Sequence, residues 1–476
     1  MLDRRTFLRG SASLAIAPAL GLTRTADADR ITASARQLAG TGGKTLRLLL
    51  PRGSAANVSP VARLFEEQSG VRLSLREVAV DAVASTASLA SVAGRPDFDI
   101  ALPATFAIPD LVEGGMLLPL DDYVAKHEPP GLATGSLYRH GDRYKGRFYG
   151  YQTDGDVYLM FYNRDLLEDP ALKSVYEDRA GRPLGVPTSW EELDGQLEFF
   201  SNSSDDRYGG TLFRIPGYVE WEWWLRLHAK GALPVDDEMN AQFHLEEGVA
   251  ALEDLVRASA WLSPGSKAQG LFENWADFAN GNTFCNLGWG GTQKYLRGPN
   301  SSLRDKLVIG PTPGGKRGEL TCPISYFNWG WNYVISKHAE EPELAYLFTL
   351  FASLPEPSTL SVRARDGFFD PHRTEHYADD QVVDTYSQPF LHQHRASLAN
   401  CIPDFYLQGR DEYFALLGLY VDRANRGELD PERALLLASR GWELITDRLG
   451  RDKQIEQWRN LKAAYPPQVL DFTSAD

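Results

Sequence analysis

Residues 218–224 combine aromatic and acidic side chains, which together could hold a ligand. Tyr218, Trp221, Trp223 and Trp224 stand in this stretch, with two glutamates between them. Carboxylates form several hydrogen bonds with hydroxyl groups, and flat rings cover apolar C–H faces. On a helix Trp221 and Trp224 share one side, so part of this cluster is expected to be core packing. We expect Tyr218 or Trp221 to stack on a ligand.

A second stretch, residues 372–376, reads HRTEH and fits the signature of inverted zinc peptidases. On a helix His372 and His376 could share a zinc ion, with Glu375 as general base. Such a site needs a third ligand and a surrounding pocket, and nothing else in the sequence supports one. We therefore expect no metal in this chain, and we keep the zinc peptidase as an alternative.

Other catalytic signatures are missing from the sequence. It has no G-x-S-x-G elbow, no phosphate-binding loop and no dinucleotide fingerprint. A glycosidase needs two carboxylates at a set separation, and the sequence alone leaves that alternative open. We expect a protein that is not an enzyme and uses no cofactor.

Polar and aromatic residues also follow two expected strands, at 46–50 and 98–102. Ligands of open α/β sheets bind at the carboxyl ends of the strands. We therefore expect the loops after both strands to contribute to a site. The candidates in these loops are Arg52, Ser54, Asn57, Thr105 and Phe106.

The scaffold that positions these residues alternates strands and helices. Apolar or alternating runs at 46–50, 71–75 and 98–102 predict strands. Ser59 followed by Pro60 predicts the start of the first intervening helix. Further helices are predicted over 245–262 and after Asp430-Pro431. The alternation predicts an α/β fold with largely parallel sheets.

The composition narrows the class of protein. The chain has 476 residues and a formal net charge of −15, with 43% hydrophobic residues. This length predicts two domains, and the acidic excess argues against a nucleic-acid partner. Three cysteines far apart in sequence leave at least one free thiol, and buried apolar thiols are expected.

Residues 1–28 have the features of an export signal. Arg4 and Arg5 precede a short apolar run, and residues 26–28 (ADA) form a small-x-small cleavage pattern. The paired arginines resemble the twin-arginine signal, which predicts a periplasmic protein. The apolar run is too short to span a membrane. Residues 29–43 are small and polar and predict a flexible leader.

Six short pieces, in order along the chain, resemble one family. They are 65–71 (FEEQSGV), 96–100 (PDFDI), 115–121 (GMLLPLD), 159–166 (LMFYNRDL), 186–193 (VPTSWEEL) and 278–289 (FANGNTFCNLGW). Together they resemble the substrate-binding proteins of carbohydrate ABC transporters, of the maltose-binding-protein type. The resemblance runs over about residues 44–465.

The resemblance implies a fold of two discontinuous α/β lobes, the type II periplasmic-binding-protein fold. Three crossings, near 151–156, 312–320 and 355–365, would join the lobes. Lobe 1 would hold residues 44–153 and 318–360, and lobe 2 would hold 154–317 and 361–476. Ligand would bind in the cleft between them, and the lobes would close on it about the hinge.

The resemblance also implies specific contacts. Asp156 lies seven residues before Asn163, where this family places an acidic ligand contact, and Asp154 is the reserve. Trp289 matches the family's ligand-stacking tryptophan, and Trp329 stands in the return segment near the cleft. Asp and Gly also favour turns, so 154–156 could simply be hinge.

The residues after the third crossing add one more candidate, Arg373. Its guanidinium could fork onto neighbouring hydroxyls or a carboxylate, and a structural salt bridge is the alternative.

These implications define the expected function. We expect a monomer that captures a small carbohydrate or polyol and delivers it to the membrane permease of an ABC transporter. A sensor or chemotaxis receptor subunit is the remaining alternative.

Overall fold

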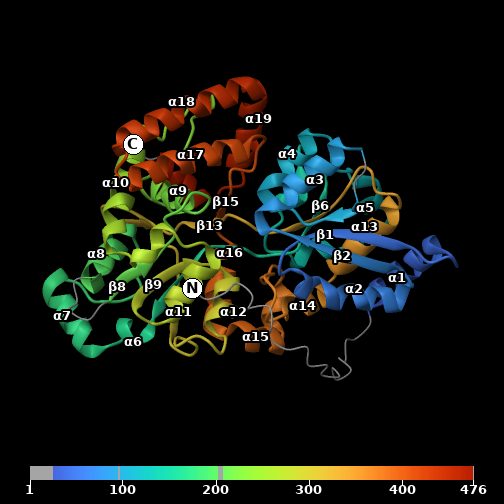
Figure 1. Cartoon of the computed structure of the whole chain (residues 1–476), viewed down its shortest axis with the longest axis horizontal. Helices are drawn as coiled ribbons and strands as arrows, with labels where there is room; N and C mark the ends of the chain where they lie inside the picture. Colours follow the sequence, from blue (N-terminus) through green and yellow to red (C-terminus); the bar gives the residue numbers. More distant parts are fainter. Residues whose placement is uncertain (1–24, 95–96, 202–206, 475–476) are drawn as a thin grey trace.

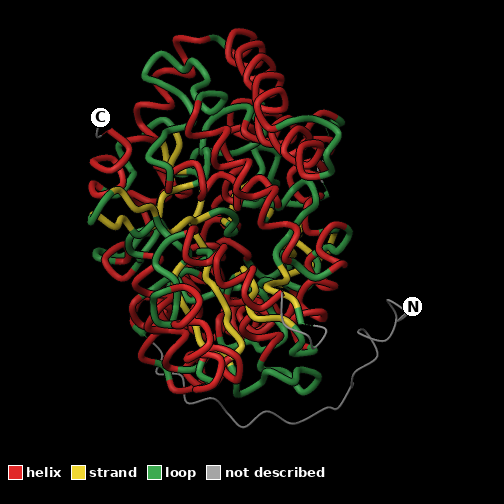
Figure 2. Tube along the Cα trace, turned by 90° about the vertical axis from the view of Figure 1, so that its left-hand side faces the viewer, coloured by secondary structure: helices red, strands yellow, loops and turns green. Residues whose placement is uncertain are grey.

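A computed structural model of the chain describes residues 25–94, 97–201 and 207–474. The described residues form two lobes, each with its own sheet inside a shell of helices (Figures 1 and 2). In Figure 1 the blue N-terminal elements share the right-hand lobe with the orange helix α13 (Pro342–Ala352). Each lobe is therefore assembled from stretches that are far apart in the sequence.

The first lobe is built on a five-stranded sheet of order β2-β1-β3-β14-β6. β1 runs parallel to β2 and β3, and β14 runs antiparallel to β3 and β6. The expected strands at 46–50, 71–75 and 98–102 are confirmed. The strands are β1 (Thr45–Pro51), β2 (Arg72–Val78), β3 (Ile100–Ala101), β6 (Gly150–Gln152) and β14 (Asn332–Ile335).

Helices and one small hairpin complete this lobe. The helices are α1 (Ala26–Ala39), α2 (Ala55–Ser69), α3 (Val83–Val92), α4 (Ile108–Glu113), α5 (Asp121–His127), α13 and α14 (Pro355–Val362); the hairpin is β4 (Arg143–Tyr144) with β5 (Arg147–Phe148). The expectation that Ser59 caps the first helix after β1 is wrong, because α2 already begins at Ala55. Pro60 lies inside the helix, where it removes one backbone hydrogen bond.

The second lobe is built on a four-stranded sheet of order β10-β7-β9-β8. β7 is antiparallel to both neighbours, and only β8 and β9 are parallel. The expectation of a largely parallel sheet is wrong here, because β7 enters the lobe and β10 leads back out of it, so the two must run in opposite directions. The strands are β7 (Leu159–Asn163), β8 (Tyr208–Thr211), β9 (Thr283–Gly288) and β10 (Leu307–Pro311).

Most of the helices belong to this second lobe. They are α6 (Arg164–Leu167), α7 (Pro170–Ala180), α8 (Trp190–Ser201), α9 (Val219–Ala229), α10 (Glu246–Ala258), α11 (Leu271–Ala279), α12 (Gly290–Leu296), α15 (Asp380–Tyr386), α16 (Gln388–Leu398), α17 (Arg410–Asn425), α18 (Pro431–Leu449), α19 (Arg451–Lys462) and α20 (Pro467–Ser474). The helices expected over 245–262 and after Asp430-Pro431 are confirmed as α10 and α18. Red α17, α18 and α19 form the upper part of this lobe in Figure 1.

The second crossing comes later than expected. The hairpin of β11 (Gly315–Arg317) and β12 (Leu320–Cys322) packs on the second lobe, where Gly315 faces Ala229 and Phe472. Lobe 1 therefore does not resume at residue 318, because this hairpin completes the surface of lobe 2. The chain next forms β13 (Ser325–Phe327), which pairs with β15 (Cys401–Pro403), and then re-enters the first sheet as β14.

The N-terminal segment also differs from expectation. A flexible leader over 29–43 is wrong for most of its length, because helix α1 occupies Ala26–Ala39. Ile31 and Ala35 are wholly buried in the core cluster of the first lobe, which also holds Phe348 of α13. The apolar side of α1 was too small to stand out as a periodic pattern. The cleavage pattern at 26–28 lies in the first turn of α1, and the paired arginines lie outside the described residues.

The expectation for the cysteines is confirmed: Cys285, Cys322 and Cys401 are all free and buried. No helix among the described residues has both the length and the apolar character needed to cross a membrane.

The burial of α1 leads to a stability prediction. In a chain that begins at Thr25, Ile31→Ala should lower the free energy of unfolding by about 2–5 kcal/mol, because it leaves a cavity against α13. Leu38→Ala is the matched control, since Leu38 on the same helix is 43% exposed. Denaturant unfolding measures both. Equal effects of the two substitutions would contradict a docked α1.

Candidate functional site

A pocket with about 480 Å³ of empty space, part of it open to solvent, lies between the lobes. Its walls come from the first lobe, from the second lobe and from the segments that cross between them. Six of the ten lining residues are aromatic. The lining residues are Val80, Asp156, Tyr218, Leu271, Trp275, Trp289, Gly291, Trp329, Trp331 and Phe368.

Four of the candidates from the sequence line this pocket: Asp156, Tyr218, Trp289 and Trp329. They come from four separate segments, which only the fold brings together. The sequence reasoning missed the other six. Trp331 could have been found from its place two residues after Trp329, and Leu271 and Trp275 from their i, i+4 spacing on α11. Phe368 follows no recognisable signal.

Trp289 is held rigidly at the end of β9, just before α12. Its indole N–H donates to Asn328 Oδ1 at 2.9 Å, and its backbone N–H donates to Thr292 Oγ1 at 3.1 Å. Its ring packs on Tyr158, with centroids 4.7 Å apart. A ring fixed in this way can offer a ready surface for a ligand.

Two further candidates, Trp221 and Phe106, lie behind the pocket wall. Both rings pack edge-on against Trp329, with centroids at 5.3 Å and 5.6 Å. The guanidinium of Arg410 lies 3.8 Å from the centre of the Phe106 ring and pairs with Asp404 at 2.6 Å. These residues support the wall and do not line it.

Three carboxylates meet where the chain crosses between the lobes. Asp154 Oδ1 accepts the backbone N–H of Asp370 at 2.6 Å, and Asp156 Oδ2 accepts that of Gly330 at 3.3 Å. Asp370 in turn accepts the N–H of Gly290 at 2.7 Å and the hydroxyl of Tyr386 at 2.8 Å. Burial first, and then mutual repulsion, raises the pKa of Asp154 and of Asp156 well above the usual range.

The buried cation beside this cluster is Lys294. Its ammonium group donates to three backbone carbonyls, of Ala364, Gly367 and Phe369, at 2.8–3.3 Å. Burial lowers the pKa of Lys294 to about 8, against the attraction of the carboxylates. Oxygens of Asp154, Asp156 and Asp370 lie within 4.8 Å of one another, and no other group of three possible metal ligands in the described ranges lies this close.

Candidates from the loop after β1 and from the loop after β3 lie outside the pocket. Arg52 is exposed and Ser54 is wholly buried. Asn57 is part of α2, where its amide donates to the Ser361 carbonyl at 2.9 Å and accepts the Phe368 N–H at 2.8 Å. Thr105 donates to Asn332 Oδ1 at 2.7 Å. Asn57 thus positions the segment that carries Phe368 into the pocket.

Arg373 also lies outside the pocket, in a structural role. Its guanidinium donates to the Leu132 carbonyl at 3.1 Å and to Ser136 at 3.2 Å, and it pairs with Glu375 at 3.2 Å. Arg373 therefore links the third crossing to the first lobe. This is the structural salt bridge that was expected from the sequence as the alternative to ligand binding.

The HRTEH stretch does not form the helix that the zinc peptidase alternative requires. Residues Thr374–Ala378 form a 3-10 turn. His376 Nδ1 accepts the His372 backbone N–H at 3.2 Å, and its Nε2 bonds Ser358 Oγ at 3.0 Å. Burial lowers the pKa of His372 to about 3 and also lowers that of His376. Both nitrogens of His376 are already bonded, so the pair fastens the third crossing to α14.

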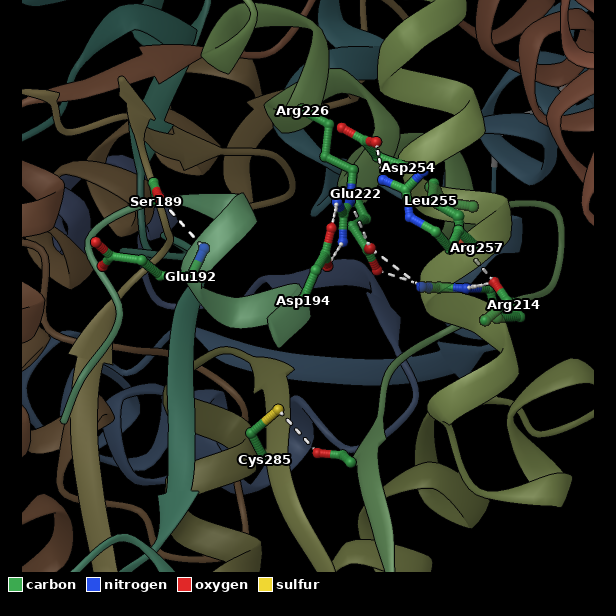
Figure 3. A network of polar contacts seen from close by, with 12 residues as sticks. Ser189, Glu192, Asp194, Arg214, Glu222, Arg226, Asp254, Leu255, Arg257 and Cys285 are labelled. Atoms are coloured by element: carbon green, nitrogen blue, oxygen red, sulfur yellow. Dashed lines mark hydrogen bonds and ion pairs between the residues drawn. The ribbon is translucent and has the colours of Figure 1, made fainter. Parts of the chain in front are cut away.

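Helix α9, which follows Tyr218 and carries Trp221, is fixed by buried ion pairs (Figure 3). Glu222 pairs with Arg214 at 2.6 Å and with Arg226 at 3.0 Å, and Arg226 pairs with Asp194 at 2.7 Å. Burial alone would raise the pKa of Glu222, but the two arginines outweigh it and hold that pKa below its usual range. The network balances two positive charges with two negative ones.

Known proteins share this two-lobed architecture, and a family model matches most of the chain. The model of a family described as bacterial extracellular solute-binding protein matches residues 61–386. Maltose-bound MalE3 of T. maritima superposes with a TM-score of 0.69 at 17% identity, covering 84% of this chain and 100% of that one. A comparison with curated proteins finds no match.

Two further solved structures are similar. The ABC transporter solute-binding protein of Agrobacterium vitis S4 with bound D-mannitol gives a TM-score of 0.69 at 18% identity, covering 86% of this chain and 99% of that one. The GacH receptor of Streptomyces glaucescens GLA.O, solved unliganded and with acarbose, gives 0.64 at 19%, covering 89% and 99%. These likenesses confirm the predicted two-lobed fold.

The buried ion pairs of α9 yield a prediction. Glu222→Gln should lower the free energy of unfolding by about 3–5 kcal/mol, because it leaves two buried arginines facing one carboxylate. Glu456→Gln, at an exposed position on α19, should change it by less than about 0.5 kcal/mol. Urea unfolding of both variants measures the difference, and a tolerant Glu222→Gln would show that the network is dispensable.

The hydrogen bonds of His372 and His376 yield a second prediction, about zinc content. The purified protein should retain far less than one zinc per chain at neutral pH, because His376 has no free nitrogen for a metal. Elemental analysis after dialysis measures this. Stoichiometric zinc that His376→Gln removes would instead revive the zinc peptidase.

Proposed function

Because the chain belongs to the family of bacterial extracellular solute-binding proteins, we propose that it captures a carbohydrate or polyol between its lobes. It delivers this ligand to the membrane permease of an ABC transporter. It acts as a monomer and without catalysis.

The observation that carries this proposal is the origin of the pocket walls. Val80 belongs to the first lobe, Tyr218 and Trp275 belong to the second, and Asp156 and Phe368 lie on crossing segments. A ligand held by all of these binds more tightly when the lobes are closed than when they are apart. Binding energy can therefore drive closure, which the permease reads.

The ligand class is supported by the structures that share the fold. The proteins compared above were solved with maltose, D-mannitol and acarbose, and a similar one from Agrobacterium radiobacter K84 with ribitol. Aromatic rings beside a carboxylate suit such molecules, since rings cover C–H faces and the carboxylate accepts from hydroxyl groups.

Location follows from the same family. An extracellular solute-binding protein works outside the cytoplasm, and we propose the periplasm for this chain. The paired arginines at 4–5 and the apolar run after them support export by the twin-arginine route.

A thermal-shift screen tests the proposal. Mono-, di- and oligosaccharides, polyols and sugar acids are added to the purified protein, and at least one should raise the melting temperature. Chromatography should recover that ligand unchanged after long incubation, because a binding protein does not turn it over. Conversion of the ligand would favour the glycosidase alternative.

Substitution in the pocket gives a second test. Trp289→Ala and Asp156→Ala should each weaken the best ligand of that screen at least tenfold, about 1.4 kcal/mol, because each removes one wall of the pocket. Trp261→Ala is the matched control, since Trp261 is partly exposed and lines no part of the pocket. Calorimetry measures the affinities, and circular dichroism verifies folding. Wild-type affinity in both pocket variants would contradict the assigned site.

A further inference from the structure

The interlobe pocket has very few polar side-chain groups for its size. Among its ten lining residues, only Asp156 and Tyr218 carry a charged group or a hydroxyl, and the rest are aromatic, aliphatic or glycine. The indole N–H groups of Trp275 and Trp329 are inaccessible to solvent. The ligand's remaining hydroxyl groups would therefore have to lie toward the open side of the pocket, because an unpaired hydroxyl group in a closed cleft is costly.

Carboxyl groups are concentrated on one side of this pocket. Asp156 lies on the wall, and Asp154 and Asp370 lie close behind it, with oxygens of all three within 4.8 Å. Lys294 does not pair with them directly, because its ammonium group donates to three carbonyls. Asp154 is wholly buried and its Oδ2 has no hydrogen-bond partner. Three carboxyl groups therefore face one buried cation, and burial with mutual repulsion raises the pKa of Asp154 and of Asp156 well above the usual range. A positively charged ligand beside them would favour their ionised form.

Aromatic walls and an acidic group together favour a positive guest. The face of an indole or phenyl ring attracts an ammonium group, and aromatic cages bind such groups in other proteins. A carboxylate at the wall adds a charge-assisted hydrogen bond or a direct Coulomb attraction. In the water-poor space between closed lobes both effects are stronger than at a surface.

We propose that this pocket selects a ligand with a positively charged nitrogen, namely an amine-bearing carbohydrate or polyol. This inference rests on the proposed function of the pocket as the ligand site. Asp156 is the specificity-determining residue, because it is the carboxyl group of the cluster that lines the pocket.

The test compares matched pairs of probes that differ in charge. Calorimetry is run on the full mature protein with glucosamine against glucose, glucamine against sorbitol, and choline against 3,3-dimethylbutan-1-ol, at a pH where the amines are protonated. The cationic member of at least one pair should bind at least tenfold more tightly. Equal or weaker binding of the cationic members, or no binding in any pair, overturns the inference.

Substitution assigns the preference to the pocket. Asp156→Asn should reduce the advantage of the cation to less than threefold, whereas Asp380→Asn, at an exposed position on α15, should leave it unchanged. Melting temperatures of both variants verify folding. If Asp156→Asn does not fold, the charge-matched probe pairs on the wild-type protein decide the inference. A preference that survives Asp156→Asn overturns the assignment.

Two outcomes separate this inference from the proposed function. Binding of choline with no binding of any carbohydrate or polyol supports the selection of a cation and overturns carbohydrate capture. Tight binding of neutral sugars alone supports carbohydrate capture and overturns the selection of a cation. Stabilisation by Ca²⁺ or Mg²⁺, lost in Asp154→Asn and without any binding of organic cations, shows a metal site and overturns the inference.

Discussion

The burial of three carboxylates at the crossings constrains the rest of this molecule. Asp154, on the first crossing, accepts the backbone N–H of Asp370, on the third. Asp370 also accepts the N–H of Gly290 at the start of α12, so one carboxyl group links a crossing to the second lobe. Position 290 has to be glycine, because a Cβ there would lie 2.3 Å from the Asp370 carboxylate. The same carboxyl cluster therefore joins the crossing segments to one another and lies against the pocket wall.

Two kinds of buried charge serve different purposes in this protein. Around α9, Arg214 and Arg226 are matched by Glu222 and Asp194, so the network has no charge left over and holds a helix in place. At the crossings three carboxyl groups lie beside one buried lysine, Lys294. The balanced network around α9 stabilises the fold, whereas the carboxyl cluster at the crossings has raised pKa values and one unpartnered oxygen, on Asp154.

Much of the architecture could be predicted from local sequence. Apolar runs located β1, β2 and β3, helical apolar spacing located α10, and Asp430-Pro431 located the start of α18, because these signals depend only on neighbours in the sequence. Helix α1 escaped prediction, since alanines give a weak apolar pattern and only contact with α13 reveals which side is buried. The reversed direction of β7 escaped for a similar reason, because strand direction depends on where the chain enters the lobe.

The sequence by itself determined which residue types a site could use. Tyr218 was identified from its chemistry, and Asp156, Trp289 and Trp329 were identified from the resemblance of their segments to a known family. Only the tertiary structure decided which of the candidates share a cavity. It assigned Asn57 and Arg373 to bonds that position the crossings, and it added Phe368, which has no local signal. The physical reason is that a cleft between discontinuous lobes is lined by residues up to almost 300 positions apart, from Val80 to Phe368, and no local pattern records such a meeting.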